Sequence, residues 1–201
     1  IGVVGRNGGG KSTLLHVMAG NIEPDSGRVT RTGGTRVGVL TQAADLHPDQ
    51  TIRNFIAGDR DAYEWLSQAR ARDCFTALLG GFDDERLDRT LGQLSGGERR
   101  RVELAALVLD DIDLMILDEP TNHLDIEAVA WLAGYLRSQR SLALVVVTHD
   151  RWFLDEVSDR TWEVVNGNVE EYDGGYSAFV LAKAERARQA SAEQARRNNL
   201  I

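Results

Sequence analysis

Short apolar runs alternate with longer amphipathic stretches along this chain. The apolar runs end in glycine or polar residues, and the strands expected from them are Ile1–Val4, Val37–Gln42, Asp113–Pro120 and Val145–Asp150. Runs rich in Val, Ile and Leu without polar alternation are typical of strands that are buried on both faces of a parallel sheet. Because helical stretches separate these runs, the pattern predicts an α/β fold with a mainly parallel sheet.

Two segments depart from this alternation. From about Ala43 to Leu109 the pattern is helical, which predicts an α-helical subdomain inserted into the core. Residues 182–201 are rich in alanine, lack proline and glycine, and carry too few apolar side chains to be buried, so they predict an exposed helix. We therefore expect one main domain over residues 1–181 and the start of a separate helix over residues 182–201.

Composition and charge narrow the possible functions. The chain has 201 residues and a hydrophobic share of 42%, enough for one domain with a buried core. Its net charge of −8 argues against a surface that coats nucleic acid, but residues 183–197 hold five basic and two acidic side chains, a local charge of +3. No apolar run approaches the roughly 18 residues of a membrane-spanning helix. The single cysteine, Cys74, permits no internal disulfide, so we expect a cytoplasmic protein.

A glycine-rich segment between the first expected strand and the first expected helix fits the phosphate-loop pattern G-x-x-x-x-G-K-[ST]. Glycines let backbone N–H groups approach phosphate oxygens, and the helix N-terminus that follows favours anions. Lys11 would neutralise the β- and γ-phosphates, and the Ser12 hydroxyl would bind Mg²⁺. The motif therefore predicts a nucleotide site. Its expected residues are Gly5, Arg6, Asn7, Gly8, Gly9, Gly10, Lys11, Ser12 and Thr13.

The expected strand Asp113–Pro120 carries two acids at its end. Because proline cannot continue the hydrogen-bond ladder, Asp118 and Glu119 are predicted to lie at the carboxyl end of the strand. Ligands bind at that end in open parallel sheets. We expect Asp118 to hold Mg²⁺ and Glu119 to act as the general base that polarises an attacking water.

A third motif lies between these two. Ser95 is expected to cap the helix that follows, with Glu98 completing a capping box. Capping does not explain the adjacent glycines, which cost helix stability of order 1 kcal/mol per residue. The motif Leu94, Ser95, Gly96, Gly97, Glu98 resembles the signature of ATP-binding cassette (ABC) ATPases. In that family the signature binds the γ-phosphate of ATP that is held by an opposing cassette.

Further motifs follow in the order that the ABC family shows. Gln42 matches the family's glutamine loop, and His149 matches the switch histidine that senses the γ-phosphate. Asp125 matches the D-loop aspartate and is also a good helix N-cap. The resemblance thus implies ATP and Mg²⁺ as ligands. It implies Glu119, His149 and Gln42 as catalytic residues, and Ser12, Gln42 and Asp118 as metal ligands.

The resemblance implies a P-loop NTPase fold. ABC domains usually begin with an antiparallel β-subdomain and an aromatic residue that stacks on adenine. Since Ile1–Val4 are the residues ahead of the glycine loop, we expect this N-terminal β-subdomain to be missing or truncated in the sequence. Selectivity for adenine is therefore implied by the resemblance and not by residues of this chain.

Three local features resemble the F subfamily of ABC proteins, most of all the first cassette of its translational throttle group. They are Glu98 in place of the usual glutamine, the segment Thr148–Asp155, and the segment Tyr172–Phe179 with a charged helix after it. Members of this subfamily have two cassettes in one chain, no membrane domain, and a helical linker that reaches the ribosome. The resemblance implies ATP hydrolysis in translation regulation or antibiotic resistance.

The same resemblance implies the partners. They are a second cassette, in the same chain or in a head-to-tail dimer, and the ribosome, with rRNA or tRNA contacted through the linker that begins at residues 182–201. Two alternatives share the motifs described so far: the ATP-binding subunit of a membrane transporter and a DNA-repair cassette.

Overall fold

A computed structural model describes residues 1–40, 47–58, 60–61, 68–81 and 83–198. Within these residues, six strands form one sheet in the order β2-β3-β4-β1-β5-β6. Neighbouring strands are parallel except for β5 and β6, which are antiparallel. The predicted α/β fold with a mainly parallel sheet is confirmed. The strands are β1 (Gly2–Gly5), β2 (Val37–Leu40), β3 (Leu114–Asp118), β4 (Ala143–Val147), β5 (Arg160–Val165) and β6 (Asn168–Asp173).

The central strands are apolar throughout because both faces of the sheet are covered. Alternate residues such as Ile116 and Val147 pack with Leu15 of helix α1 (Lys11–Ala19). Their neighbours in sequence, such as Leu117 and Val146, belong to a second core cluster on the other face. Side chains of a strand point alternately to opposite faces, so a strand covered on both sides must be apolar at every position.

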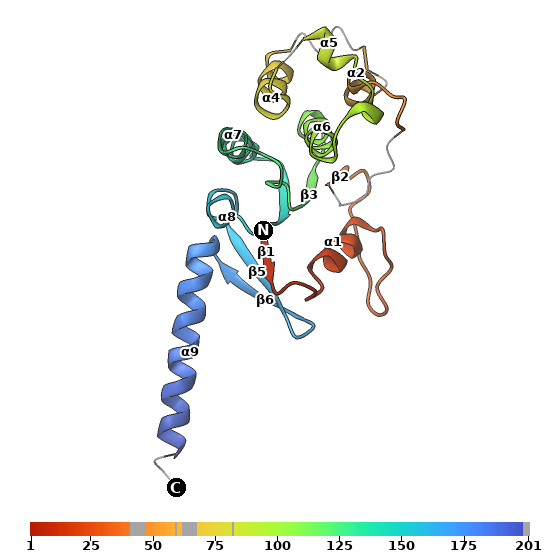
Figure 1. The fold of residues 1–201 in the computed structure, drawn as a ribbon. Helices are drawn as coiled ribbons and strands as arrows, with labels where there is room; N and C mark the ends of the chain where they lie inside the picture. The colour runs from red at the N-terminus through yellow and green to blue at the C-terminus, as the bar shows by residue number, and fades with distance from the viewer. Residues whose placement is uncertain (41–46, 59, 62–67, 82, 199–201) are drawn as a thin grey trace.

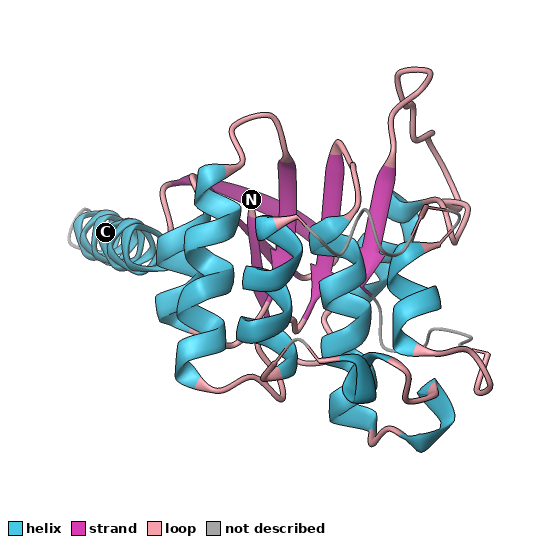
Figure 2. Cartoon of the chain, turned by 90° about the horizontal axis from the view of Figure 1, so that it is seen from above, coloured by secondary structure: helices cyan, strands magenta, loops and turns pink. Residues whose placement is uncertain are grey.

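Helices fill the intervals between the strands, and Figure 2 shows several of them lined up along one side of the sheet. Between β2 and β3 the described elements are all helices, in agreement with the expected helical insert. The helices other than α1 are α2 (Ile52–Ala57), α4 (Ala69–Leu79), α5 (Asp84–Leu87), α6 (Gly96–Leu109), α7 (Ile126–Ser138), α8 (Arg151–Val157) and α9 (Tyr176–Asn198), with a 3₁₀ turn over Leu91–Gln93.

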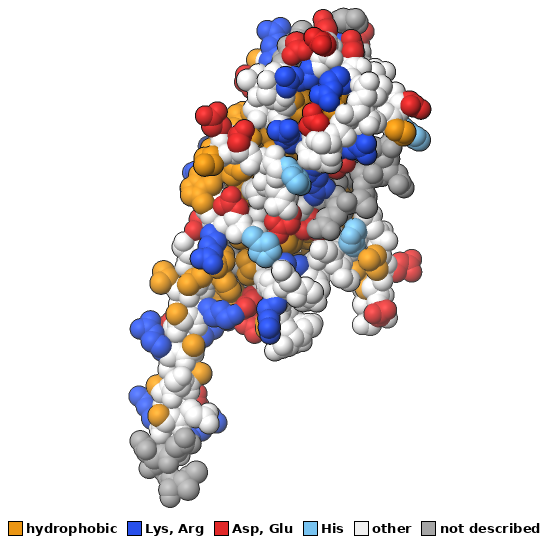
Figure 3. All heavy atoms as spheres, viewed as in Figure 1, with side chains coloured by type: hydrophobic (Ala, Val, Ile, Leu, Met, Phe, Trp, Pro, Cys, Tyr) orange, Lys and Arg blue, Asp and Glu red, His pale blue; other side chains and the backbone are white. Residues whose placement is uncertain are grey.

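Helix α9 leaves the body of the molecule as a rod, drawn blue in Figure 1. It begins at Tyr176, ahead of the expected start at residue 182, because its first turns pack on the domain. Phe179 is buried there, with its ring centroid 5.0 Å from that of Tyr172 on β6. Residues 184–197 are exposed, and Figure 3 shows basic side chains along this part of the helix. None of the described helices, α9 included, is long and apolar enough to span a bilayer.

Candidate functional site

The glycine loop joins β1 to α1, as predicted. Gly8 and Gly10 have φ of 73° and 98°, in the left-handed region, and Gly10 is the N-cap of α1. A Cβ at either position would meet no atom within 4 Å, so both glycines border open space. Their positive φ values explain why glycine is needed, and the open space lets a ligand approach the backbone closely. The first residues of α1 border the same space, and a helix N-terminus favours an anion.

Lys11 is the first residue of α1, and its side chain folds back over the loop. Its Nζ donates to the carbonyl oxygens of Gly5 at 2.9 Å and Arg6 at 3.0 Å. Both acceptors are main-chain atoms of the loop itself. The ammonium group is therefore held at the centre of the glycine loop, where a phosphate would be closest to it.

Ser12 and Asp118 meet at the carboxyl end of the sheet although 106 residues separate them in sequence. The Ser12 Oγ donates to Oδ2 of Asp118 at 3.0 Å, and Asp118 is 4% exposed. Hydroxyl and carboxylate oxygens suit Mg²⁺, which takes one or two protein ligands and completes its shell with water and phosphate. Among the described residues there is no cluster of three or more metal-ligating His, Cys, Asp or Glu side chains. The residues present thus fit Mg²⁺ bound together with a nucleotide.

Glu119 and His149 form a second pair beside the first. The His149 Nε2 lies 3.5 Å from Oε1 of Glu119, and the His149 N–H donates to Oε2 at 3.4 Å. The Glu119 side chain is 14% exposed and that of His149 is 69% exposed. Glu119 has φ of 51°, a left-handed conformation that is uncommon for residues other than glycine and that clusters at functional sites. A sheltered carboxylate beside an accessible imidazole can accept a proton from a water in the cleft.

These residues line one open cleft of about 430 Å³. Its volume lies within the usual range for small-molecule sites, about 300–1,000 Å³. The cleft brings together most of the predicted nucleotide, metal and catalytic side chains, and adds two that the sequence did not single out, Asn122 and Val147. The lining residues are Asn7, Gly8, Gly10, Lys11, Ser12, Thr13, Asp118, Glu119, Asn122, Val147 and His149.

Three of the predicted glycine-loop residues, Gly5, Arg6 and Gly9, do not line this cleft. Gly5 and Arg6 line a neighbouring groove together with Lys11. Gly9 closes the turn of the loop, because its N–H donates to the Arg6 carbonyl oxygen at 3.0 Å. Gln42 lies outside the described residues.

The signature motif opens α6 with the predicted capping box. The Glu98 N–H donates to Ser95 Oγ at 3.3 Å, and the Ser95 N–H donates to Oε2 of Glu98 at 2.8 Å. Hydrogen bonds from the Ser95 backbone and hydroxyl lower the pKa of Glu98 to about 2. Leu94 is buried, whereas Ser95 and Gly96 are exposed. None of the five signature residues lines the cleft described above, so an anion bound at Ser95 is not one bound at Lys11 of the same chain.

We expect Ser95→Ala to destabilise the domain by about 1 kcal/mol, since it removes the N-cap of α6. Urea denaturation monitored by circular dichroism measures this change. The matched control is Ser191→Ala, an exposed serine within α9, whose effect should stay within about 0.5 kcal/mol. The contribution of Glu98 is present above its unfolded pKa and fades as pH falls toward about 2, because its folded pKa is depressed.

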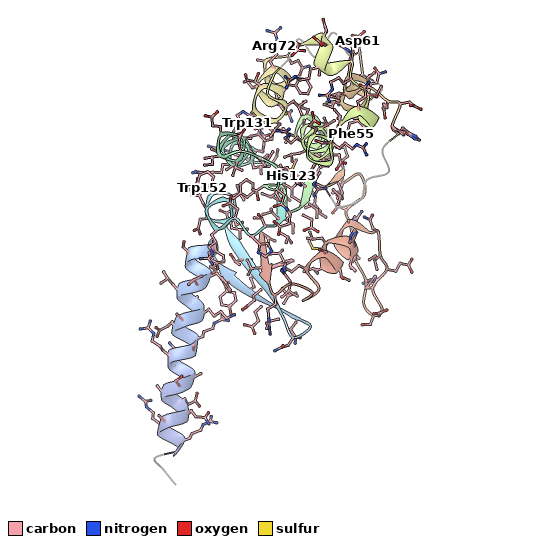
Figure 4. The ribbon with its side chains drawn as sticks, in the orientation of Figure 1. Phe55, Asp61, Arg72, His123, Trp131 and Trp152 are labelled. Atoms are coloured by element: carbon pink, nitrogen blue, oxygen red, sulfur yellow. The ribbon has the colours of Figure 1, made fainter. Side chains whose placement is uncertain are left out.

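Asp125 caps α7, as predicted. Its Oδ1 accepts a hydrogen bond from the Ala128 N–H at 2.8 Å. The same loop holds His123, which lies beside α6 in Figure 4. A Cβ added to Gly97 would stand 3.3 Å from the His123 Cβ, so the loop packs closely on the start of α6. The D-loop role implied for Asp125 by the resemblance stays a prediction.

The fold and the site define a P-loop nucleotide-binding domain. The family profile described as "ABC transporter" matches residues 1–122, more than half of the chain. The chain therefore belongs to the ABC family.

Curated relatives place the chain more narrowly. Energy-dependent translational throttle protein EttA of Mycobacterium tuberculosis is 39% identical over 219 residues, which cover 92% of this chain and 39% of that protein. EttA of Escherichia coli is 36% identical over 236 residues, which cover all of this chain and 42% of that protein. The uncharacterized ABC transporter ATP-binding protein YfmR of Bacillus subtilis is 35% identical over 239 residues, which cover all of this chain and 37% of that protein. These relatives confirm the resemblance to the F subfamily, and the chain spans less than half the length of each.

Solved structures agree on the fold. A protein titled "RNase-L Inhibitor" superposes with a TM-score of 0.74 and 29% identity, over 92% of this chain and 36% of that chain. An ATP-binding subunit of an ABC transporter superposes with a TM-score of 0.70 over 86% of this chain and 77% of that chain. Its identity of 24% supports the ABC fold alone.

Proposed function

We propose that the cleft binds ATP with Mg²⁺ and hydrolyses the γ-phosphate bond. The observation that carries this proposal is the pairing of Ser12 with Asp118 and of Glu119 with His149 in the cleft that also holds Lys11. Ser12 and Asp118 would hold the metal, which neutralises developing charge on the phosphates when bound. Lys11 and the loop N–H groups would hold the phosphates, and Glu119 would take the proton of the attacking water.

The division of labour between the two acids follows from their surroundings. Asp118 is buried and hydrogen-bonded to Ser12, so its oxygens are committed to the metal position. Glu119 faces His149 and the cleft. The main-chain N–H of His149 donates to Glu119 Oε2, and the exposed ring could donate a hydrogen bond to a phosphate oxygen. These two contacts would align the base with the attacking water.

We further propose that hydrolysis needs two cassettes. The signature residues do not line the cleft of their own chain, and Ser95 and Gly96 are exposed at the N-terminus of α6. A helix N-terminus of this kind binds an anion. The nucleotide of a second cassette supplies that anion, so an isolated domain would turn ATP over slowly.

For the intact protein we propose action on the ribosome, in the manner of the F subfamily. The support is the identity to relatives that are named translational throttle proteins, together with the exposed basic helix α9. Phosphate contacts by arginine and lysine supply most of the non-specific affinity for nucleic acid. The nucleotide-binding domain carries more acidic than basic side chains, whereas the exposed part of α9 is basic. This distribution suits a protein that contacts RNA through α9 and not through the rest of its surface.

The base of α9 is anchored to the domain. The Ser177 N–H donates to Oδ1 of Asp155, on α8, at 2.7 Å. Lys183 forms an ion pair with the buried carboxylate of Glu163, which raises the pKa of Lys183. Arg186 lies over the Tyr172 ring, 4.3 Å from its centroid. The rod is therefore fixed to the nucleotide-binding domain, while Arg188, Arg196 and Arg197 lie beyond these contacts.

We expect the full-length protein carrying Glu119→Gln to co-sediment with ribosomes in the presence of ATP, because the ATP-bound form accumulates when the base is absent. Association should weaken as salt rises, since phosphate contacts release counterions. Changing Arg188, Arg196 and Arg197 to glutamine should reduce co-sedimentation without changing ATP affinity. Arg186 stays in place because it packs on Tyr172.

The matched control changes Arg72, Arg137 and Arg140, which are exposed on the body of the domain, to glutamine. It alters the net charge equally and should leave ribosome association intact. Co-purification of the trapped protein with membranes instead of ribosomes would favour the transporter alternative.

A further inference from the structure

Helix α6 begins at the signature motif and reaches the end of β3 through Arg100, within two turns of its start. The Arg100 Nη2 donates to the main-chain carbonyl oxygen of Asp118 at 2.5 Å. The Arg100 side chain is 14% exposed, and its Nη1 lies 3.5 Å from Oε2 of Glu103. A charged hydrogen bond in such a sheltered position is stronger than a neutral one and restrains its acceptor.

The carbonyl group of Asp118 and the N–H group of Glu119 belong to the same peptide unit. That N–H donates to the Val147 carbonyl oxygen, on β4, at 2.7 Å. A peptide unit is planar, so holding both of its ends fixes its orientation. Helix α6 holds one end of this unit through Arg100, and β4 holds the other.

Glu119 depends on this restraint because of its backbone conformation. Its φ of 51° is one that a side chain of this size adopts when the surroundings impose it. The orientation of the 118–119 peptide sets the direction in which the Glu119 side chain leaves the backbone. Rotation of this peptide would move the carboxylate from its place 3.5 Å from His149 Nε2.

We propose that Arg100 is a positioning residue that links the signature end of α6 to the orientation of the Glu119 carboxylate. A phosphate that binds at Ser95 changes the position or the mobility of α6. Because Arg100 joins α6 to the 118–119 peptide, this change alters the orientation of the peptide that carries the general base. The packing of Gly97 on His123 adds a second contact between α6 and the loop that follows Glu119. ATP in the opposing cassette would thereby align the base of this one. The link to hydrolysis rests on the proposed function.

Hydrogen exchange on the full-length protein tests the positioning without any catalysis. We expect Arg100→Met to speed exchange of the amides of residues 118, 119, 121 and 122, and to leave those of residues 143–147 in the neighbouring strand β4 unchanged. Arg53→Met is the matched control: Arg53 is 12% exposed, lies on α2, and pairs with Asp84 and Asp88 instead of β3. It should leave exchange at residues 118, 119, 121 and 122 unchanged. Equal exchange in Arg100→Met and wild type would overturn the proposal.

ATP turnover tests the link to the signature. Arg100→Met should lower kcat roughly tenfold or more through misplacement of the base, with the Kd for ATP within about twofold of wild type. In a Ser95→Gly background, which removes the hydroxyl at little cost to the cap, the same change should lower kcat by less than about twofold. If Arg100→Met lowers kcat by the same factor in the wild-type and Ser95→Gly backgrounds, then Arg100 acts independently of the signature. That result would overturn the proposed coupling between the signature and Glu119.

Two further outcomes are decisive. If Arg100→Met does not fold, Arg100→Lys keeps a cation with a shorter reach and fewer donors, and the same exchange measurement applies to it. If the wild-type protein hydrolyses no ATP, the proposed function fails, and the exchange result still decides whether Arg100 holds the peptide of Glu119.

Discussion

Glu119→Gln should lower ATP hydrolysis by about 10²-fold or more while ATP and Mg²⁺ still bind, because the amide cannot accept the proton of the attacking water. The structure makes this a test of chemistry rather than of folding. The contact of Glu119 with β4 is made by its main-chain N–H and not by its side chain, and glutamine keeps the size of the side chain. Phosphate release at saturating ATP measures the effect.

The neighbouring acid supplies the contrast. Asp118→Asn should weaken Mg²⁺-dependent nucleotide binding, since Asp118 shares the metal position with Ser12. Glu127→Gln, a change of an acid in the first turn of α7 away from the cleft, serves as the control and should hydrolyse ATP like wild type. Wild-type turnover by Glu119→Gln would remove Glu119 from the role of general base.

Lys11→Ala should abolish measurable ATP binding and leave the fold intact. The ammonium group is bonded to two carbonyl oxygens of the glycine loop and lies in no core cluster. Its loss removes the positive charge from the place where the phosphates are expected. Isothermal titration calorimetry of the intact protein with ATP and Mg²⁺ measures the affinity.

The chain has one other lysine, which provides a matched control. Lys183→Ala removes the ion pair with Glu163 at the base of α9. Lys183 lines the groove beside the cleft but not the cleft itself. The substitution should reduce the stability of the α9 anchor without abolishing ATP binding. Undiminished ATP binding by Lys11→Ala would place the phosphates elsewhere.

Much of the fold and of the cleft could be predicted because the signals are local. The apolar run before Asp118 predicts a buried strand, and the proline after Glu119 predicts that the strand ends at these two acids. The structure agrees, since β3 ends at Asp118. The caps at Ser95 and Asp125 depend on residues three positions apart, and the structure has both.

One local signal was missed. Residues Asn166 and Gly167 join β5 to β6 in a two-residue hairpin, with φ of 50° and 75°. An Asn-Gly pair between two strand-forming segments is the strongest short-range signal of a hairpin. The prediction from sequence therefore did not include the antiparallel pair of β5 and β6 at the edge of the sheet.

Other features could not be read from sequence because they join distant segments. The approach of His149 to Glu119, and the bond from Arg100 to a main-chain oxygen, depend on how α6 and the strands pack. A main-chain acceptor has no residue type, so no motif marks it. The early start of α9 had a weak local signal in Tyr176 and Phe179, two aromatic residues at helical spacing that pack together.

We propose that this ATP-hydrolysing cassette acts on the ribosome. The most direct test is phosphate release from ATP by the full-length protein, measured alone, with purified ribosomes, and with membrane vesicles at matched salt. We expect ribosomes to raise the rate, vesicles to leave it unchanged, and the Arg188, Arg196 and Arg197 glutamine variant to lose the stimulation. Stimulation by vesicles and none by ribosomes would contradict the claim.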